Sequence, residues 1–191
     1  LSEEIIPIGE CKEDGNIRPN STQEKLDQLK LAFDTKGTVT AATSSPLTDG
    51  AAATIICEEN YAKENNLNIL GRIISTAVEG CDPDYMGLGP IGASKKALMR
   101  ANLSIDKIDI FELNEAFASQ SLACIKDLGI DQKKVNIDGG ALALGHPLGA
   151  TGARITGKAA DLLRRENKKY ALSTQCIGLG MGIATVIESV D

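Results

Sequence analysis

The chain contains no tryptophan, and aromatic residues make up only 3% of its 191 positions. Hydrophobic residues still account for 42% of the sequence, so the core must be built from aliphatic side chains and alanine. Such residues suit layered α/β structures, whose buried strands are rich in Ile, Leu and Val. The length corresponds to one large domain, or to a domain and a half.

The chain has no basic excess. Its 20 basic and 26 acidic residues give a net charge of −6, whereas a nucleic-acid surface needs clustered positive charge. No apolar run reaches the ~18 residues of a membrane span. The first ten residues, LSEEIIPIGE, lack the basic and apolar regions of a secretory signal. We therefore expect neither a nucleic-acid partner nor a membrane span.

Cysteines are few, and their spacing forms no CxxC motif. An odd number of widely separated cysteines argues against a disulfide framework and against a zinc site. We therefore expect a reducing, cytoplasmic compartment and no bound metal. The five are Cys11, Cys57, Cys81, Cys124 and Cys176.

From residue 70 onward, glycine-bounded β-type runs alternate with segments of helical periodicity. This alternation predicts an α/β layered domain, in which the last two strands lie side by side and antiparallel. Strands are predicted over 70–80, 108–113, 169–176 and 182–190, and helices over 89–103, 114–129 and 152–167.

The first 69 residues do not predict a self-sufficient unit. A short helix is expected after Ser21 as N-cap, with Glu24 completing a capping box. Residues 38–40 are predicted to form a strand, and 50–53 a tightly packed helix start or strand. A polar helix is expected to end near Asn66. This region resembles the tail of something longer.

Three loops follow predicted elements and combine a reactive or polar side chain with small residues. They are NEAF (114–117), GHPLG (145–149) and CIGLGMG (176–182), and in α/β sheets such strand ends build sites. Taken singly, Asn114 could be a helix N-cap, His146 a structural histidine and Cys176 an inert buried thiol. Together they favour acyl chemistry. An imidazole can activate or stabilise a thiolate, a thiol can exchange protons, and glycine N–H groups can hold an oxyanion.

The same three loops, in this order, resemble the C-terminal half of a thiolase. VNIDGGALALGHPLGATGAR is similar to the family's histidine signature, CIGLGMGIA to its terminal cysteine signature, and NEAFA to its asparagine motif. GTVTAATSSPLTDGAAA, GCDPDYMGLGP and FASQSLACIKDLG resemble the degradative branch, the 3-ketoacyl-CoA thiolases of fatty-acid β-oxidation. The resemblance implies the C-terminal half of a five-layered α-β-α-β-α fold with mixed sheets.

The resemblance also implies roles for individual residues. His146 would activate a nucleophilic cysteine and, with a water held by Asn114, form one oxyanion hole. Cys176 would exchange a proton with the α-carbon of the acetyl unit, and the N–H of Gly178 would contribute to a second oxyanion hole. Coenzyme A would be a substrate, with no resident cofactor. Five residues fall where the family contacts pantetheine or the nucleotide: Ser45, Phe33, Arg18, Met86 and Phe117.

Three of these contacts have an ordinary alternative: core packing for Phe33 and Met86, and a solvated surface charge for Arg18. Two positions depart from the family pattern. Pro46 stands where biosynthetic relatives commonly carry Gly, and Asp138 replaces a residue that is often Asn.

The largest departure is the missing nucleophile. The family places its acyl-accepting cysteine in a Cys-x-Ser-Gly-like context, and none of the five cysteines has one. We therefore expect 1–35 to be a remnant of the loop domain, 36–69 the end of the N-terminal domain and 70–191 the C-terminal domain. The chain alone would be inactive. A helix face would be left uncovered, so we expect the chain to associate with a second copy of itself or with a separate N-terminal half.

Three functions remain open on the sequence. The first is the C-terminal part of a degradative thiolase, whose parent enzyme would be oligomeric and could join a β-oxidation multienzyme complex. The second is an acetoacetyl-CoA-forming thiolase, which the Ser45-Pro46 and 80–83 details disfavour. The third is a non-catalytic acyl-CoA or lipid-binding module, which the presence of Asn114, His146 and Cys176 disfavours. A ketoacyl synthase would be expected to show two catalytic histidines here, but the chain has one.

Overall fold

The structure, a computed structural model, describes residues 3–190. A four-stranded mixed sheet forms its centre, in the order β1-β4-β3-β2. Strand β2 is parallel to β3, whereas β4 is antiparallel to both β3 and β1. The strands are β1 (Arg72–Gly80), β2 (Ile110–Leu113), β3 (Tyr170–Ile177) and β4 (Met181–Glu188). The predicted antiparallel pairing of the last two strands is confirmed.

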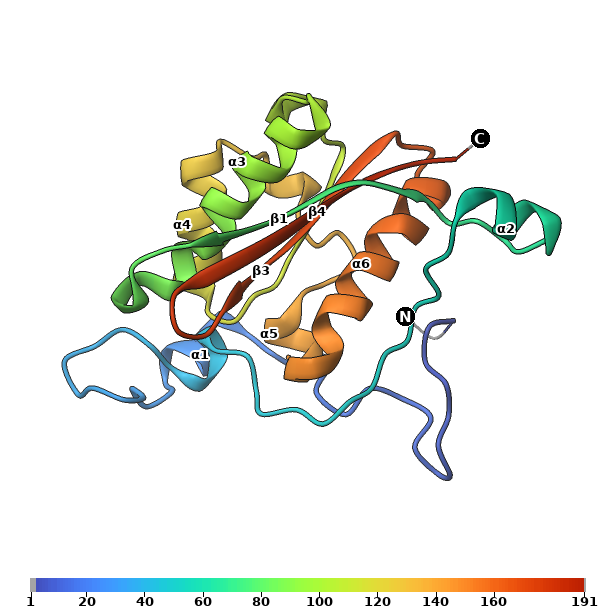
Figure 1. Cartoon of the computed structure of the whole chain (residues 1–191). Helices are drawn as coiled ribbons and strands as arrows, with labels where there is room; N and C mark the ends of the chain where they lie inside the picture. The colour runs from blue at the N-terminus through green and yellow to red at the C-terminus, as the bar shows by residue number, and fades with distance from the viewer. Residues whose placement is uncertain (1–2, 191) are drawn as a thin grey trace.

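Helices cover both faces of this sheet, which gives three layers (Figure 1). Helices α3 (Gly89–Ala101) and α4 (Ala118–Leu128) lie on one face, and α6 (Leu148–Arg165) lies on the other. The α/β layered fold class is therefore confirmed. The shorter helices are α1 (Gln23–Asp27), α2 (Glu59–Glu64), α5 (Ala141–Leu144) and the 3-10 turns η1 (Ala41–Thr43), η2 (Pro83–Leu88), η3 (Ile105–Lys107) and η4 (Gln132–Lys134).

Side-chain alternation along the strands divides the core into two clusters. Phe111 and Leu172 point toward α3 and pack in one cluster. Ile110 and Ala171 point toward α6 and pack in the other. Because both faces are buried, the central strands read as near-continuous apolar runs. The same alternation decides which face each polar residue at the strand ends occupies.

Helix α3 begins in close contact with the β3–β4 hairpin, and glycines permit this approach. A Cβ on Gly89 would overlap the carbonyl of Met181, and a Cβ on Gly182 would overlap the backbone of Gly89. The contact fixes the hairpin against the first turn of α3.

Several predictions for the first part of the chain are wrong. Helix α1 begins after Thr22, whose hydroxyl accepts from Lys25 N–H at 3.4 Å, so Ser21 and Glu24 form no capping box. Residues 38–40 form no strand, and only a single bridge joins Leu31 to Thr40. The segment 50–53 is neither helix nor strand. A strand requires a hydrogen-bonded neighbour, and no other strand among residues 3–190 lies beside this segment. The polar helix is confirmed as α2, which ends at Glu64.

Residues 48–57 instead run as an extended segment along α6 (Figure 1). A Cβ on Gly50 would lie 2.9 Å from the Pro147 ring, and one on Gly157 would lie 3.3 Å from Thr54. This segment covers part of α6. Its own Ile55 and Ile56 are 87% and 73% exposed, and Leu148 in the first turn of α6 is 79% exposed.

Within the described residues, no helix is both long and apolar enough to cross a membrane.

Candidate active site

The candidate site lies where β2 and β3 end side by side. Asn114 extends the ladder beyond β2, because its N–H donates to the carbonyl of Thr174 at 2.9 Å. Helix α4 begins only at Ala118, with Phe117 at the N-cap position. The alternative of Asn114 as a helix N-cap is therefore wrong. Its side chain is 1% exposed, and neither Oδ1 nor Nδ2 has a hydrogen-bond partner among the described residues.

Glu115 joins the asparagine loop to the glycine-rich loop. Its carboxylate accepts from Asn136 Nδ2 at 2.8 Å and from the N–H of Leu142 at 3.0 Å. A Cβ on Gly140 would overlap this carboxylate. The glycine is thus required so that the carboxylate can hold the loop. Sequence reasoning did not assign this role to Glu115.

His146 lies just before α6 and contacts two threonines, Thr48 through its backbone and Thr151 through its ring. Its backbone N–H donates to Thr48 Oγ1 at 3.2 Å, and its Nδ1 lies 2.7 Å from Thr151 Oγ1. Thr151 Oγ1 also donates to the Pro147 carbonyl at 3.2 Å. With its proton engaged there, Thr151 can accept from Nδ1–H, and the tautomer that carries its proton on Nδ1 has a lone pair on Nε2, where the ring can act as a base.

Thr151 was missed in the sequence, although a hydroxyl residue five positions after the histidine, in the first turn of a helix, was the available signal. Thr151 is fully buried. Burial lowers the pKa of His146 below its usual value, and the positive charge of Arg154 lowers that pKa further. The imidazole is therefore kept neutral at physiological pH.

Cys176 lies in β3 opposite Gly182. Burial raises the pKa of its thiol, and Cys81 adds to this increase. The environment therefore favours the protonated thiol rather than the thiolate that the neighbouring glycines suggested. Beyond it, Gly178 stands at the hairpin turn with open space where a Cβ would lie, so a ligand can approach its backbone.

The structure brings the three motif residues to one edge of the sheet but divides them between its faces. Side-chain alternation places Cys176 with Thr174 on the α3 face, and Asn114 with Ser173 on the α6 face. Ser173 Oγ lies 3.1 Å from Thr156 Oγ1 of α6, which confirms the second assignment. His146 precedes α6 and so belongs with Asn114.

Four of the five residues predicted to contact coenzyme A gather near this edge. Phe33 and Phe117 pack edge to face, with ring centroids 6.5 Å apart. Both line a cavity of about 530 Å³, together with Tyr85 and Gly87 on either side of Met86. The N–H of Ser45 donates to the carbonyl of Ala116 at 3.0 Å, beside Phe117. Arg18, in contrast, is solvent-exposed and does not line the cavity.

Phe33 has an unusual conformation for a bulky residue. Its φ is +68°, in the left-handed region, and its side chain is 88% exposed. Bulky residues rarely adopt this conformation, which is found mainly at functional sites and tight turns. The ordinary core-packing alternative for Phe33 is therefore wrong.

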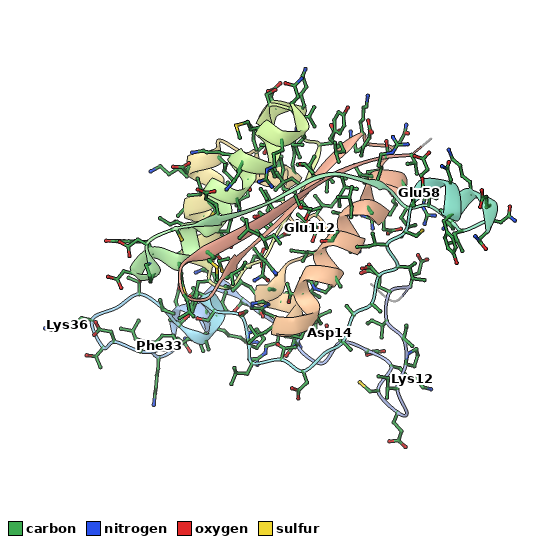
Figure 2. The ribbon with its side chains drawn as sticks, in the orientation of Figure 1. Lys12, Asp14, Phe33, Lys36, Glu58 and Glu112 are labelled. Carbon is green, nitrogen blue, oxygen red and sulfur yellow. The ribbon has the colours of Figure 1, made fainter. Side chains whose placement is uncertain are left out.

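Charged side chains gather between β2 and α6, and the buried Glu112 of β2 is labelled in Figure 2. Burial raises the pKa of Glu112 to about 8, although Arg154 and Lys158 oppose this shift. Asp138 receives bonds from Arg165 at 2.6 and 2.7 Å and from Lys158 at 2.7 Å. The pair with Arg165 holds the pKa of Asp138 well below its usual range, despite burial. These ion pairs give a structural reason for an aspartate at this position.

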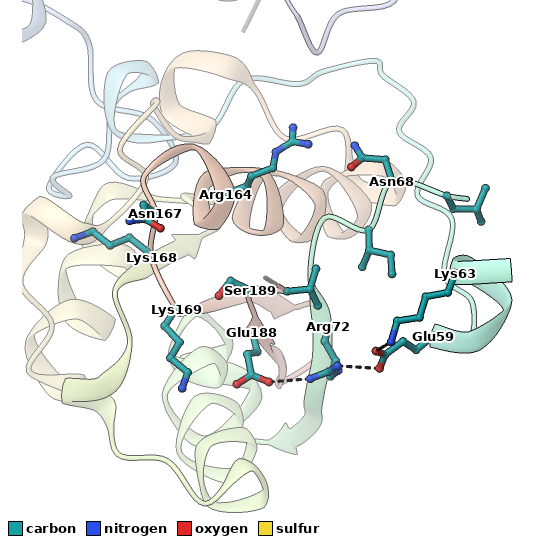
Figure 3. Close-up of a pocket in the computed structure, with 13 residues that line it drawn as sticks. Glu59, Lys63, Asn68, Arg72, Arg164, Asn167, Lys168, Lys169, Glu188 and Ser189 are labelled. Atoms are coloured by element: carbon teal, nitrogen blue, oxygen red, sulfur yellow. Dashed lines mark hydrogen bonds and ion pairs between the residues drawn. The ribbon is translucent and has the colours of Figure 1, made fainter. Parts of the chain in front are cut away.

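A second cavity, of about 840 Å³, lies at the opposite end of the sheet. There Arg72 is paired with Glu59 at 2.8 Å and with Glu188 at 3.3 Å (Figure 3). Glu59 also pairs with Lys63. Arg72 and Lys63 are thus paired with the two carboxylates of the lining, and none of the predicted site residues lines this cavity.

Comparison with known families supports the motifs. The family description "Thiolase, C-terminal domain" matches residues 67–189, and "Thiolase, N-terminal domain" matches residues 1–60. The 3-ketoacyl-CoA thiolase of Salmonella typhimurium is 52% identical over 98% of the chain, and that of Citrobacter koseri is also 52% identical over 98%. In both cases the chain spans about half of the relative, 52% of its length.

Solved structures show the same similarity. Human mitochondrial 3-ketoacyl-CoA thiolase superposes with a TM-score of 0.87 and 46% identity, over 93% of this chain and 45% of that one. A structure of the human enzyme in complex with CoA covers 94% of this chain and 45% of its own, with a TM-score of 0.87 and 45% identity. Bacillus anthracis acetyl-CoA acetyltransferase gives a TM-score of 0.90 and 43% identity, over 93% and 45% of the two chains.

Proposed function

The chain belongs to the thiolase family, and from this premise we propose that it is part of a degradative 3-ketoacyl-CoA thiolase. The reaction is thiolysis of a 3-ketoacyl-CoA by CoA, which gives acetyl-CoA and a shortened acyl-CoA. One observation carries the proposal. His146 with a lowered pKa, the Cys176 thiol with a raised pKa and the buried carboxamide of Asn114 lie toward the same end of the sheet, and Phe117, three residues after Asn114, lines an apolar cavity.

The cleavage half-reaction requires a cysteine nucleophile that these 191 residues do not supply. Nε2 of His146 takes the proton of that thiol, and the sulfur attacks the C3 carbonyl of the substrate. When the C2–C3 bond breaks, its electron pair remains on C2 of the acetyl-CoA unit. Sγ–H of Cys176 protonates C2, and the raised pKa of Cys176 keeps that proton available near neutral pH.

The transfer half-reaction returns His146, Cys176 and the nucleophilic cysteine to their starting protonation states. The Cys176 thiolate takes the proton of an incoming CoA thiol, and the CoA sulfur attacks the acyl thioester. The enzyme's cysteine leaves as a thiolate and recovers its proton from the His146 imidazolium. Oxyanions formed along the way would be held by His146 with water at Asn114, and by the N–H of Gly178.

The cavity beside the site fits the pantetheine arm and the acyl chain. Its lining is mostly apolar, with Phe33 and Phe117 facing each other and Ser45 beside them. The CoA complex of the human relative supports coenzyme A as the ligand class. Coenzyme A is thus a substrate, and no resident cofactor is required. Met86 would border the arm, and Arg18 would have to reach the nucleotide from its exposed loop.

We further assign residues 70–191 to the C-terminal domain, 36–69 to the end of the N-terminal domain and 1–35 to the loop domain. The two family models meet between residues 60 and 67, close to the proposed start of the C-terminal domain, whereas the division at residue 35 rests on the resemblance alone. The natural partner is then an N-terminal thiolase half that covers the exposed Ile55 and Ile56. Association of the parent enzyme with itself, and with a β-oxidation complex, belongs to the same proposal. Five unpaired cysteines fit a reducing cytoplasmic setting.

An acetoacetyl-CoA-forming thiolase is the second candidate. The structural similarity to the Bacillus anthracis acetyl-CoA acetyltransferase, with a TM-score of 0.90 and 43% identity, keeps this candidate open beside the human thiolase, with 0.87 and 46%. The proton exchange at Cys176 serves either direction, so the chemistry is shared. A non-catalytic binding module is less well supported, since binding alone does not require the oriented imidazole of His146.

The decisive experiment measures acetyl-CoA release from a 3-ketoacyl-CoA and CoA by chromatography. The chain would be assayed alone and mixed with the N-terminal half of a 3-ketoacyl-CoA thiolase. We expect turnover only in the mixture, and its loss when His146→Ala replaces the wild-type chain. Because His146 is the only histidine of the chain, no second imidazole can substitute for it in this variant.

Three results would change the assignment. Turnover by the chain alone would show that the nucleophile lies within it, and Cys176→Ser would identify it. Condensation of acetyl-CoA at a rate that exceeds thiolysis would favour the acetyltransferase. A mixture that forms a complex, as judged by size-exclusion chromatography, but has no turnover in either direction would reject both enzymatic candidates.

A further inference from the structure

Gln175 is the cross-strand neighbour of Asn114 at the candidate site. Leu113 pairs with Thr174 in the parallel ladder, so the next positions on the two strands are Asn114 and Gln175. Both lie two residues beyond the pair Glu112 and Ser173, on the face that is covered by α6. The register thus brings two carboxamides together at the sheet edge, one position before Cys176.

Buried polar atoms of both carboxamides have no partner among the described residues. They are Oδ1 and Nδ2 of Asn114 and Oε1 of Gln175. Buried amide groups in folded proteins are almost always hydrogen-bonded to protein or to ordered water. A set that contains both a donor and acceptors is the kind that holds a buried water.

The surroundings leave room for this group. Gly152, in the first turns of α6, faces Gln175, and a Cβ there would lie 3.4 Å from Nε2. The row of unpartnered atoms continues away from the edge, to Oε1 of Glu112 and Nε of Arg154. By the strand register Glu112 lies on the same α6-facing side as Asn114 and Gln175, so the unpartnered carboxamides are not an isolated case.

We propose that Gln175 is a positioning residue, which together with Asn114 holds and orients an ordered water at the active-site edge. The water accepts from Asn114 Nδ2 and donates one hydrogen to Gln175 Oε1. Its second hydrogen is then directed toward the oxygen of a bound thioester. This inference rests on the proposed function. It adds Gln175 to a role that the family resemblance gave to Asn114 alone.

The test uses Gln175→Leu, which keeps the size but removes the acceptor, and Gln175→Glu, which keeps an acceptor oxygen. Thiolysis would be measured with each variant mixed with the N-terminal half. We expect kcat to fall about 10- to 100-fold for Gln175→Leu, with KM changed less than about 2-fold, because the loss concerns the transition state. Gln175→Glu should recover a large part of kcat. Gln132→Leu, at an exposed position of η4, is the matched control.

A crystal structure of the 191-residue chain provides a readout that does not depend on activity. We expect one ordered water within hydrogen-bond distance of both Asn114 and Gln175, and its loss in Gln175→Leu with the fold unchanged. If the wild-type mixture has no thiolysis, the function proposed above fails. The crystal structure would still show whether Asn114 and Gln175 hold a water between them. The proposal is overturned if the wild-type site holds no such water, or if Gln175→Leu retains full kcat.

Discussion

His146 Nδ1 lies 2.7 Å from Thr151 Oγ1, and the Thr151 hydroxyl donates to the Pro147 carbonyl. This relay is compatible with the tautomer that carries its proton on Nδ1 and leaves Nε2 as the base. A base held in that tautomer before substrate binds requires no reorganisation during proton transfer. The relay is contained within the short segment from His146 to Thr151, so it forms as soon as α6 begins.

Replacing Thr151 by Val should remove the acceptor for Nδ1–H while preserving side-chain volume. The imidazole would then sample the wrong tautomer, and we expect kcat for thiolysis in the mixed assay to fall about 10- to 100-fold. Thr151→Ser keeps the hydroxyl and should retain most of the activity. Equal activity of the Val and Ser variants would show that the tautomer is fixed in another way.

The single histidine makes proton titration by NMR unambiguous, since only one set of imidazole signals exists. We expect the pKa of His146 in the folded chain to lie below 6.5, because burial and Arg154 both disfavour the charged ring. Arg154→Met should raise this pKa, whereas Arg164→Met, at the exposed end of the same helix, should leave it unchanged. A pKa above 6.5 in the wild type would contradict the prediction.

The same lowered pKa has a consequence for stability. Below pH 6.5, the ordinary pKa of the ring, the unfolded chain binds a proton at His146 more readily than the folded chain does. The free energy of unfolding should therefore decrease as pH falls from about 6.5 toward the pKa of the folded state. His146→Gln should remove this contribution, so its unfolding free energy should depend less on pH across that window. Urea unfolding at about pH 7 and about pH 5.5 measures both slopes.

Asp138→Asn should destabilise the fold, because it removes the carboxylate that pairs with both Lys158 and Arg165. The Lys158 side chain is only 3% exposed, and it would keep Glu4 as its remaining anionic partner. We expect a loss of about 1–3 kcal/mol. Asp161→Asn removes an exposed pair with Arg164 and should change stability by less than about 0.5 kcal/mol. Comparable losses for the two variants, in urea unfolding, would contradict the prediction.

Gly89→Ala should destabilise the contact between α3 and the β3–β4 hairpin, since the new Cβ would overlap the Met181 carbonyl. The overlap is with backbone and cannot be relieved by a side-chain rotation, so we expect a loss of about 2 kcal/mol or more. Gly149→Ala is the matched control in α6, where nothing lies within 4 Å of the new Cβ. It should be neutral or stabilising by up to about 1 kcal/mol. Thermal unfolding of both variants measures the difference.

Much of the second part of the chain could be predicted from the sequence. Local periodicity identified the strands and helices after residue 70, and Gly129 marked the end of α4 through its left-handed φ of +66°. These elements could be predicted because the features that mark them, an apolar stripe at helical spacing or a glycine at the helix end, lie within the same short stretch of sequence. The strand predicted at 38–40 and the helix start or strand predicted at 50–53 are absent, because regular structure in this region depends on a partner that no local pattern reveals.

The candidate site divides in the same way. The sequence alone pointed to Asn114, His146 and Cys176 as candidates, because each stands among small residues in its own loop and carries a group suited to acyl chemistry. It did not identify Glu115 or Gln175, since their roles arise from contacts with residues of other loops or strands. It also missed Thr151, although its partners His146 and Pro147 are local in the sequence.

By itself, the sequence determined the order of elements, the aliphatic core and the residue types available for acyl chemistry. Only the tertiary structure decided which atoms meet. Strand register placed Gln175 beside Asn114, and burial lowered the pKa of His146 and raised that of Cys176, so that both groups stay uncharged. The physical reason is that hydrogen bonds and desolvation depend on distances in space, which periodicity along the chain does not contain.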